Sequence, residues 1–319
     1  MKGKEAVDKT SGLQFNKGME DFQNESLCAK EKTKLRKKLR KRKNCKIEKA
    51  RRDIMHNENL AFDIIVQAGQ SNAQGCGIGP VAEEYVPNEN IYCLTGIYSD
   101  VTDADGKRSI TYDNSKPTLD IGDEFVNNGQ KTGELAFTFA DAYVKNGLLA
   151  EGRKVLILRT AIGGTCFKRK EWGPGCPVEE RMHELIAYAL AMNPENRIVA
   201  FLWHQGESDA AESNPVETYE QQLSDFINNV REKYHCQDVP FIAGDFCNEW
   251  KSKNLEACDP ILGVIRKLFA GEKAAFVETA DLPSNNQKTG NGDDIHFCRE
   301  SLHILGKRYF ESFLALTKR

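Results

Sequence analysis

From Leu60 onward, short apolar runs alternate with longer segments in which apolar residues recur at helical spacing. Apolar runs bounded by turn residues are typical of buried strands, and the segments between them are long enough for helices. Strands joined by helical crossovers pair in parallel, so the pattern predicts an α/β fold with a central parallel sheet covered by helices on both faces. We expect strands at 61–68, 154–160, 197–204, 239–245 and 274–279, and helices at 134–147, 178–192, 216–234, 259–270 and 299–317.

Positive charge is concentrated in one part of the chain. Between Lys30 and Arg52, fourteen Lys and Arg residues face only two Glu residues, a local net charge of +12 in a chain whose net charge is −3. The remainder is therefore acidic, which disfavours nucleic-acid binding by that part. We interpret residues 1–58 as a basic arm, disordered or marginally helical, and residues 59–319 as one domain. A solvated tail is the simplest role for the arm; the alternatives are a nuclear-import signal and contact with an acidic surface, nucleic acid included.

The sequence has neither an apolar run of eighteen residues nor an apolar segment behind the basic start at Met1. We therefore predict no transmembrane helix, no membrane partner and no secretory signal. The ten cysteines form no CxxC pair and show no metal-type spacing. They are typical of reduced thiols, which predicts a cytoplasmic protein, with a nuclear location as the alternative, and no metal site.

The apolar run at 61–68 ends in Gly69-Gln70-Ser71-Asn72. Glycine lets the backbone turn sharply, which places the Ser71 hydroxyl just beyond the carboxyl end of a strand, where open α/β sheets bind ligands. Serine is a weak nucleophile unless a base activates it and donors stabilise the oxyanion. Residues 74–132 follow directly and are rich in Gly, Asp, Asn and Thr, so we expect an irregular insertion beside this site.

Asp293 and His296 are the candidate acid and base. A spacing of three residues can bring the two side chains together on one turn. The carboxylate then accepts from the imidazole Nδ1–H and leaves Nε2 free to take a proton from serine. By itself, such a pair is more often a helix-capping Asp beside a surface His. Asp294 is a rival for the acid, and His204 is an alternative base.

Two further segments follow predicted strands and contain groups that can donate to an oxyanion. Gly163 and Gly164 follow the strand at 154–160 and can expose a backbone N–H, although a Gly-Gly pair is also an ordinary turn. Gln205 follows the strand at 197–204, and its side-chain amide either donates to the same oxyanion or satisfies a loop as a buried amide. Glu207 and Asp209 are expected to order that loop.

Taken together, the motifs resemble a known family. In chain order they are Gly69-Gln70-Ser71-Asn72, Gly163-Gly164-Thr165, Trp203-His204-Gln205-Gly206-Glu207 and Asp293-x-x-His296. They resemble the sequence blocks of the SGNH (GDSL-like) hydrolases over residues 60–317. The resemblance is closer to the sialate O-acetylesterase-like branch, which includes carbohydrate esterase family six and its acetyl xylan esterases. Gln70 and Gln205 agree with that branch, since many members of the wider superfamily have Asp and Asn there.

The resemblance implies a flavodoxin-like three-layer α/β/α sandwich and a serine esterase that needs no metal or other cofactor. Ser71 is then the nucleophile and an oxyanion donor, and His296 and Asp293 are the base and acid. Gly164, with Gly163 as the alternative, supplies a second oxyanion N–H. We expect Gln205 to be the third donor. The implied reaction is removal of acetyl groups from a carbohydrate or small glycoside.

Asn72, Trp172 and Glu207 are candidate substrate-binding residues. The Trp172 ring can offer a flat face to a sugar, but core packing or loop anchoring explains it equally well. Two other functions stay open. A thioesterase or lipid esterase on the same scaffold is disfavoured by the polar 74–132 segment. A non-catalytic scaffold or binding protein that uses the basic arm is disfavoured because every catalytic residue type is present.

Overall fold

The computed structural model describes residues 60–106, 108–127 and 129–318. The predicted basic arm at 1–58 lies outside the described residues. The strands are β1 (Ala61–Gly69), β2 (Ile91–Thr102), β3 (Arg108–Ile121), β4 (Val126–Asn127), β5 (Gln130–Lys131), β6 (Arg153–Arg159), β7 (Arg197–His204), β8 (Phe241–Gly244) and β9 (Ala274–Val277). The helices are α2 (Ser71–Gln74), α3 (Leu135–Lys145), α4 (Pro177–Ala191), α5 (Glu207–Ala211), α6 (Val216–Tyr234), α7 (Asn248–Lys253), α8 (Leu255–Leu268), α9 (Asn285–Thr289) and α10 (Arg299–Thr317).

Seven strands form one sheet in the order β3-β2-β6-β1-β7-β8-β9. Neighbouring strands run parallel except for β2 and β3, which are antiparallel. The five strands β6-β1-β7-β8-β9 follow the 2-1-3-4-5 order of flavodoxin-like sheets, in which ligands bind beyond the carboxyl ends of the strands where the order reverses. Because β1 lies between β6 and β7, its carboxyl end is at that point.

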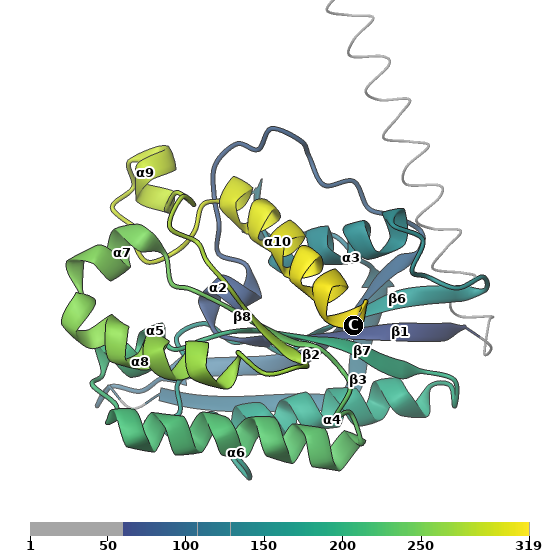
Figure 1. Ribbon diagram of the computed structural model, residues 1–319, viewed down its shortest axis with the longest axis horizontal. Helices are drawn as coiled ribbons and strands as arrows, with labels where there is room; N and C mark the ends of the chain where they lie inside the picture. Colours follow the sequence, from purple (N-terminus) through teal and green to yellow (C-terminus); the bar gives the residue numbers. More distant parts are fainter. Residues whose placement is uncertain (1–59, 107, 128, 319) are drawn as a thin grey trace, which may run out of the picture. The chain divides into compact units, whose positions relative to one another are not determined.

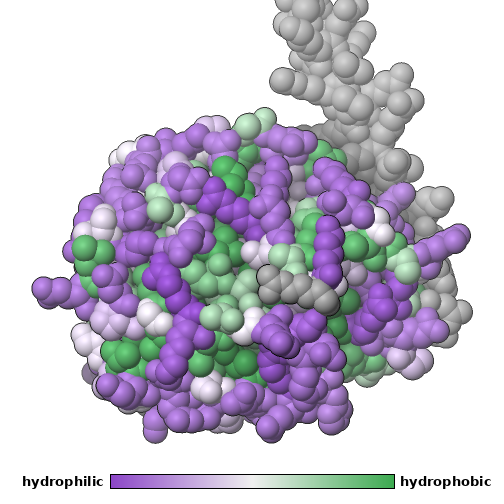
Figure 2. Space-filling model, viewed as in Figure 1, coloured by the Kyte–Doolittle hydropathy of each residue, from purple (hydrophilic) through white to green (hydrophobic). Residues whose placement is uncertain are grey.

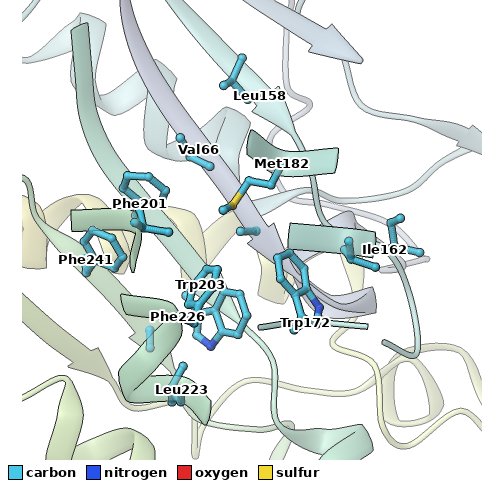
Figure 3. Close-up of a cluster of buried hydrophobic side chains, with 14 of the residues drawn as sticks. Val66, Leu158, Ile162, Trp172, Met182, Phe201, Trp203, Leu223, Phe226 and Phe241 are labelled. Carbon is cyan, nitrogen blue, oxygen red and sulfur yellow. The ribbon is translucent and has the colours of Figure 1, made fainter. Parts of the chain in front are cut away.

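Helices cover both faces of the sheet, with α4, α6 and α8 on one face and α3 and α10 on the other (Figure 1). Side chains alternate along β1, so that Ile64 and Val66 enter the first apolar cluster and Ile65 enters the second. In the first cluster the rings of Trp203 and Phe226 lie with their centroids 4.6 Å apart (Figure 3). The predicted three-layer α/β/α sandwich is thus confirmed, with one apolar core on each face of the sheet.

Hydrophilic side chains occupy most of the face seen in Figure 2, with separate hydrophobic areas between them. Among the described residues, no helix combines the length and the apolar character that a membrane crossing requires.

All eight cysteines in the described part of the chain are free thiols.

The segment at 74–132, expected to be irregular, contains the antiparallel pair β2 and β3 in its middle. The first residues of β2 pair with β6 and are buried from Ile91 to Leu94. Their burial depends on this long-range pairing, and strand propensity is decided largely by such context. Pro117 in β3 also argues against a central strand, but β3 is the edge strand, where proline is tolerated.

Gly69 allows β1 to end as it does. Its φ is +125°, and a Cβ there would lie 2.1 Å from the carbonyl oxygen of His204 on the neighbouring strand β7. Without that side chain, the Gln70 N–H donates to the same carbonyl at 2.9 Å. The turn that leads to Ser71 therefore requires glycine.

We expect Gly69→Ala to lower the free energy of unfolding by at least about 2 kcal/mol, because it adds both a strained φ and a backbone clash. Chemical denaturation measures this. Gly263→Ala is the matched control: Gly263 lies within α8, and a Cβ there meets open space. The control is expected to be neutral or slightly stabilising. Equal stability of the two variants would contradict the role given to Gly69.

Candidate active site

Ser71 is the first residue of α2, immediately after the turn at Gly69 and Gln70. The first N–H groups of a helix have no acceptor within the helix, so the Ser71 N–H is available to a ligand. The side chain is nearly buried, with 7% of the residue exposed. The turn thus places both a hydroxyl and a backbone donor at the carboxyl edge of the sheet.

The structure brings Ser71, His296 and Asp293 into one hydrogen-bonded chain. His296 Nε2 lies 2.8 Å from Ser71 Oγ, although the two residues are 225 positions apart in the sequence. On the other side of the ring, Nδ1 lies 2.9 Å from both carboxylate oxygens of Asp293. A proton on Nδ1 satisfies the carboxylate, and Nε2 is then the acceptor for the serine hydroxyl.

The environment of Asp293 keeps it ionised. Burial raises the pKa of its carboxyl group, but hydrogen bonds from His296 and from the Asn285 amide outweigh burial and leave the pKa below its ordinary value. Asp294 turns instead to Lys253, with the ammonium 2.8 Å from its carboxylate. The geometry therefore favours Asp293 over its sequence neighbour as the partner of His296.

Asn72 links the serine turn to the loop that carries His296. Its amide donates to the Ile295 carbonyl at 3.2 Å and accepts from the Phe297 N–H at 3.1 Å. These are the residues on either side of His296. The same amide donates to Glu207 at 2.8 Å, and both Asn72 and Glu207 are fully buried. Their burial leaves neither of these candidates free to contact a substrate in this structure.

Glu207 forms a second buried pair with His204, with 3.5 Å between His204 Nε2 and the carboxylate. Burial raises the pKa of Glu207, but the nearby His204 ring and the hydrogen bond from Asn72 leave the pKa below the ordinary value. The other His204 nitrogen lies 3.2 Å from the Tyr309 hydroxyl. Both His204 nitrogens are thus directed at core partners, and His296 is the imidazole that contacts Ser71.

The Gly163-Gly164 loop follows β6 and lies against Ser71. A Cβ on Gly163 would lie 3.6 Å from Ser71 Cβ. The Gly163 N–H already donates to the Gln74 side chain at 2.7 Å. The Gly164 N–H donates to no acceptor within the described part of the chain, and Gly164 has a φ of +67°, a region that favours glycine. Of the two alternatives, Gly164 is the one whose N–H is available.

Gln205 is buried, and its amide is occupied. Its Nε2 donates to Asp209 at 2.6 Å and to the Thr165 carbonyl at 3.4 Å, while its Oε1 accepts from the Tyr219 hydroxyl. Both amide hydrogens are therefore used inside the protein. Asp209 also accepts from the backbone N–H groups of Phe167 and Lys168 at 3.1 and 3.0 Å, so it links Gln205 to the loop that follows Gly164.

Trp172 lies in the core, with 1% of the residue exposed. Its ring packs edge-on against Trp203, with centroids 5.0 Å apart (Figure 3). Its indole N–H donates to the Thr165 hydroxyl at 2.8 Å. Of the alternatives in the sequence, this placement favours core packing and loop anchoring over sugar binding.

Among the described residues, no group of three or more His, Cys, Asp or Glu side chains is arranged so that it could hold a metal ion.

We expect Asn72→Ala to slow the labelling of Ser71 by a fluorophosphonate and to destabilise the fold by about 2 kcal/mol. It leaves the Phe297 N–H without its buried partner and leaves Glu207 with His204 alone. Asn196→Ala is the control, since Asn196 also bridges two buried backbone groups, Phe62 N–H and Ala189 C=O, but contacts no residue of the Ser71, His296 and Asp293 chain. It should destabilise the fold without slowing labelling. If both variants slowed labelling equally, the effect would be general softening, not alignment of His296.

The chain is similar to known proteins in sequence and in fold. A curated relative, a probable carbohydrate esterase of Arabidopsis thaliana, is 34% identical over 177 residues; the match covers 56% of this chain and 62% of that protein. Three solved structures resemble the fold: NanS (TM-score 0.62, 20% identity, covering 81% of this chain and 98% of NanS), an Arabidopsis thaliana protein (0.58, 22%, 80% and 98%) and a carbohydrate acetylesterase from Xanthomonas citri (0.51, 17%, 78% and 55%).

A family model described as carbohydrate esterase, sialic acid-specific acetylesterase matches residues 61–315, nearly all of the described chain. The match begins at β1 and includes every motif discussed above, from the serine turn to the loop of His296. The chain therefore belongs to this family of carbohydrate esterases.

Proposed function

We propose that the protein is a serine esterase that removes O-acetyl groups from a carbohydrate or small glycoside through an acyl-enzyme intermediate. The observation that carries this proposal is the chain of hydrogen bonds from Ser71 Oγ through His296 to Asp293. The choice of substrate class is supported by the family description and by the likeness in fold to a carbohydrate acetylesterase from Xanthomonas citri.

In this mechanism Ser71 Oγ attacks the acetyl carbonyl while His296 Nε2 takes the hydroxyl proton. The tetrahedral intermediate collapses as His296 returns that proton to the sugar oxygen, which leaves acetyl-Ser71 and a free sugar hydroxyl. Water, deprotonated by His296, then attacks the acetyl group and releases acetate. Asp293 holds the ring orientation and stabilises the imidazolium that forms in both halves.

The negative oxygen of each intermediate needs preorganised donors. We assign this role to the N–H groups of Ser71 and Gly164, because neither is used by a backbone or side-chain acceptor among the described residues. Gln205 was expected to be a third donor. Because its amide hydrogens are directed to Asp209 and Thr165, we assign it to holding the oxyanion loop in place.

Ser71→Ala should lower turnover of an activated acetyl ester by several orders of magnitude, because the nucleophile is lost. Ser252→Ala is the control: the Ser252 hydroxyl is exposed and donates to the Glu249 carbonyl, so full activity is expected. The wild-type protein should release acetate from O-acetylated sugars faster than it hydrolyses long-chain esters or thioesters. This comparison of rates separates the proposed function from the lipid esterase and thioesterase alternatives. A folded Ser71→Ala variant with near wild-type turnover would rule out Ser71 as nucleophile.

Asp293→Asn should lower kcat by up to about four orders of magnitude, because an amide opposite Nδ1 favours the wrong imidazole tautomer. Asp294→Asn is matched in chemistry and position but removes only a surface pair with Lys253, so its kcat should change little. Steady-state kinetics on the same ester compare the two. A larger loss in the Asp294 variant would move the acid to that residue.

A further inference from the structure

The hairpin of β2 and β3 reaches the loop that supplies the proposed oxyanion donor. Arg108, the first residue of β3, donates through Nη2 to the Gly163 carbonyl at 2.7 Å. Its guanidinium is held by Asp100 on the opposite strand β2, where Nε lies 2.8 Å from the carboxylate. Its Nη1 is also 3.5 Å from Glu171. Arg108 is therefore part of an anchored charge cluster beside the Gly163-Gly164 loop.

The Gly163 carbonyl and the Gly164 N–H belong to the same peptide group. That group is trans, so the carbonyl and the N–H point in opposite directions. A donor that holds the carbonyl on one side consequently sets the direction of the N–H on the other side. A hydrogen bond to the carbonyl also polarises the peptide and strengthens its N–H as a donor.

The same hairpin holds the preceding peptide as well. The Tyr98 hydroxyl on β2 accepts from Gln74 Nε2 at 2.9 Å, and Oε1 of the same Gln74 side chain accepts from the Gly163 N–H at 2.7 Å. Gly163 is thus bonded on its N–H side through Gln74 and on its carbonyl side by Arg108. Gly164, at a φ of +67°, has no side chain of its own to limit rotation of this loop.

We propose that Arg108 is a positioning residue for the reaction, which aims and polarises the Gly164 N–H toward the oxyanion through the Gly163 carbonyl. This inference rests on the proposed function, because it assigns a role in the same site. It also gives the β2–β3 hairpin a part in the chemistry, since Arg108 and its anchor Asp100 both come from that hairpin.

Arg169 is a matched comparison residue within the same cluster. Its guanidinium also pairs with Glu171, but it donates to the carbonyl of Gly164, which belongs to the next peptide group and carries the N–H of Thr165. Replacing either arginine removes one positive charge, one partner of Glu171 and one donor to this loop. Only Arg108→Met frees the peptide group that contains the Gly164 N–H.

The test compares Arg108→Met and Arg169→Met on a small activated acetyl ester, with melting temperatures measured in parallel. One oxyanion donor contributes about 10²–10³ in kcat, so loss of its alignment alone should lower kcat about tenfold in Arg108→Met, with KM unchanged. The kcat of Arg169→Met should stay within about threefold of the wild-type value, because this change leaves the oxyanion donor in place. Arg108→Lys, which keeps one charged donor, should recover part of kcat. Fluorophosphonate labelling of Ser71 should slow in the same order, because the phosphoryl oxygen needs the same donors.

Equal kcat in the two Met variants, or a loss confined to KM, would overturn the role of Arg108 while the proposed esterase function stands. The role of Arg108 would also be overturned if kcat fell in proportion to the melting temperature in both variants, since that result indicates a structural role. If the wild-type chain neither hydrolyses acetyl esters nor reacts with the fluorophosphonate, the proposed function fails and this inference fails with it.

Discussion

The side-chain amide of Asn72 joins the two halves of the site. It follows Ser71 in the sequence and bonds the backbone on both sides of His296, so it sets the distance between residues from opposite ends of the domain. A buried amide with its donor and acceptor satisfied is rigid, because any displacement leaves polar groups without partners in a low-dielectric interior. We infer that this link holds the 2.8 Å contact between Ser71 and His296.

Behind Asn72 lies a chain of buried polar groups that extends into the core. Glu207 accepts a hydrogen bond from Asn72 and pairs with His204. His204 in turn contacts the Tyr309 hydroxyl on α10. Burying a carboxylate is costly unless it is paired and hydrogen-bonded, and here the His204 ring and the Asn72 amide meet part of that cost. We therefore infer a mainly structural role for the motif Trp203-His204-Gln205-Gly206-Glu207. Trp203 packs in the apolar core, and Gln205 bonds Asp209 and the loop at Thr165.

The sequence predicted the layers of the fold well, because the alternation of apolar runs and amphipathic segments is a local pattern that any α/β sheet must show. It predicted the hairpin of β2 and β3 poorly, since Ile91–Leu94 are buried only after pairing with β6. Trp172 illustrates the same limit at a single residue. An aromatic ring in a Gly-rich loop is consistent with sugar binding or with core packing, and only its contact with Trp203 distinguishes the two.

By itself, the sequence determined which residue types are available for the chemistry and in which order they follow the strands, because strand ends and glycine turns are encoded locally. The tertiary structure decided between alternatives that are equivalent in the sequence. Gln74 uses the Gly163 N–H and leaves the Gly164 N–H available, and Asp293 contacts His296 and Asn285 while the Asp294 carboxylate pairs with Lys253. These choices depend on partners far away in the chain, and a hydrogen bond is directional, so no local pattern could specify them.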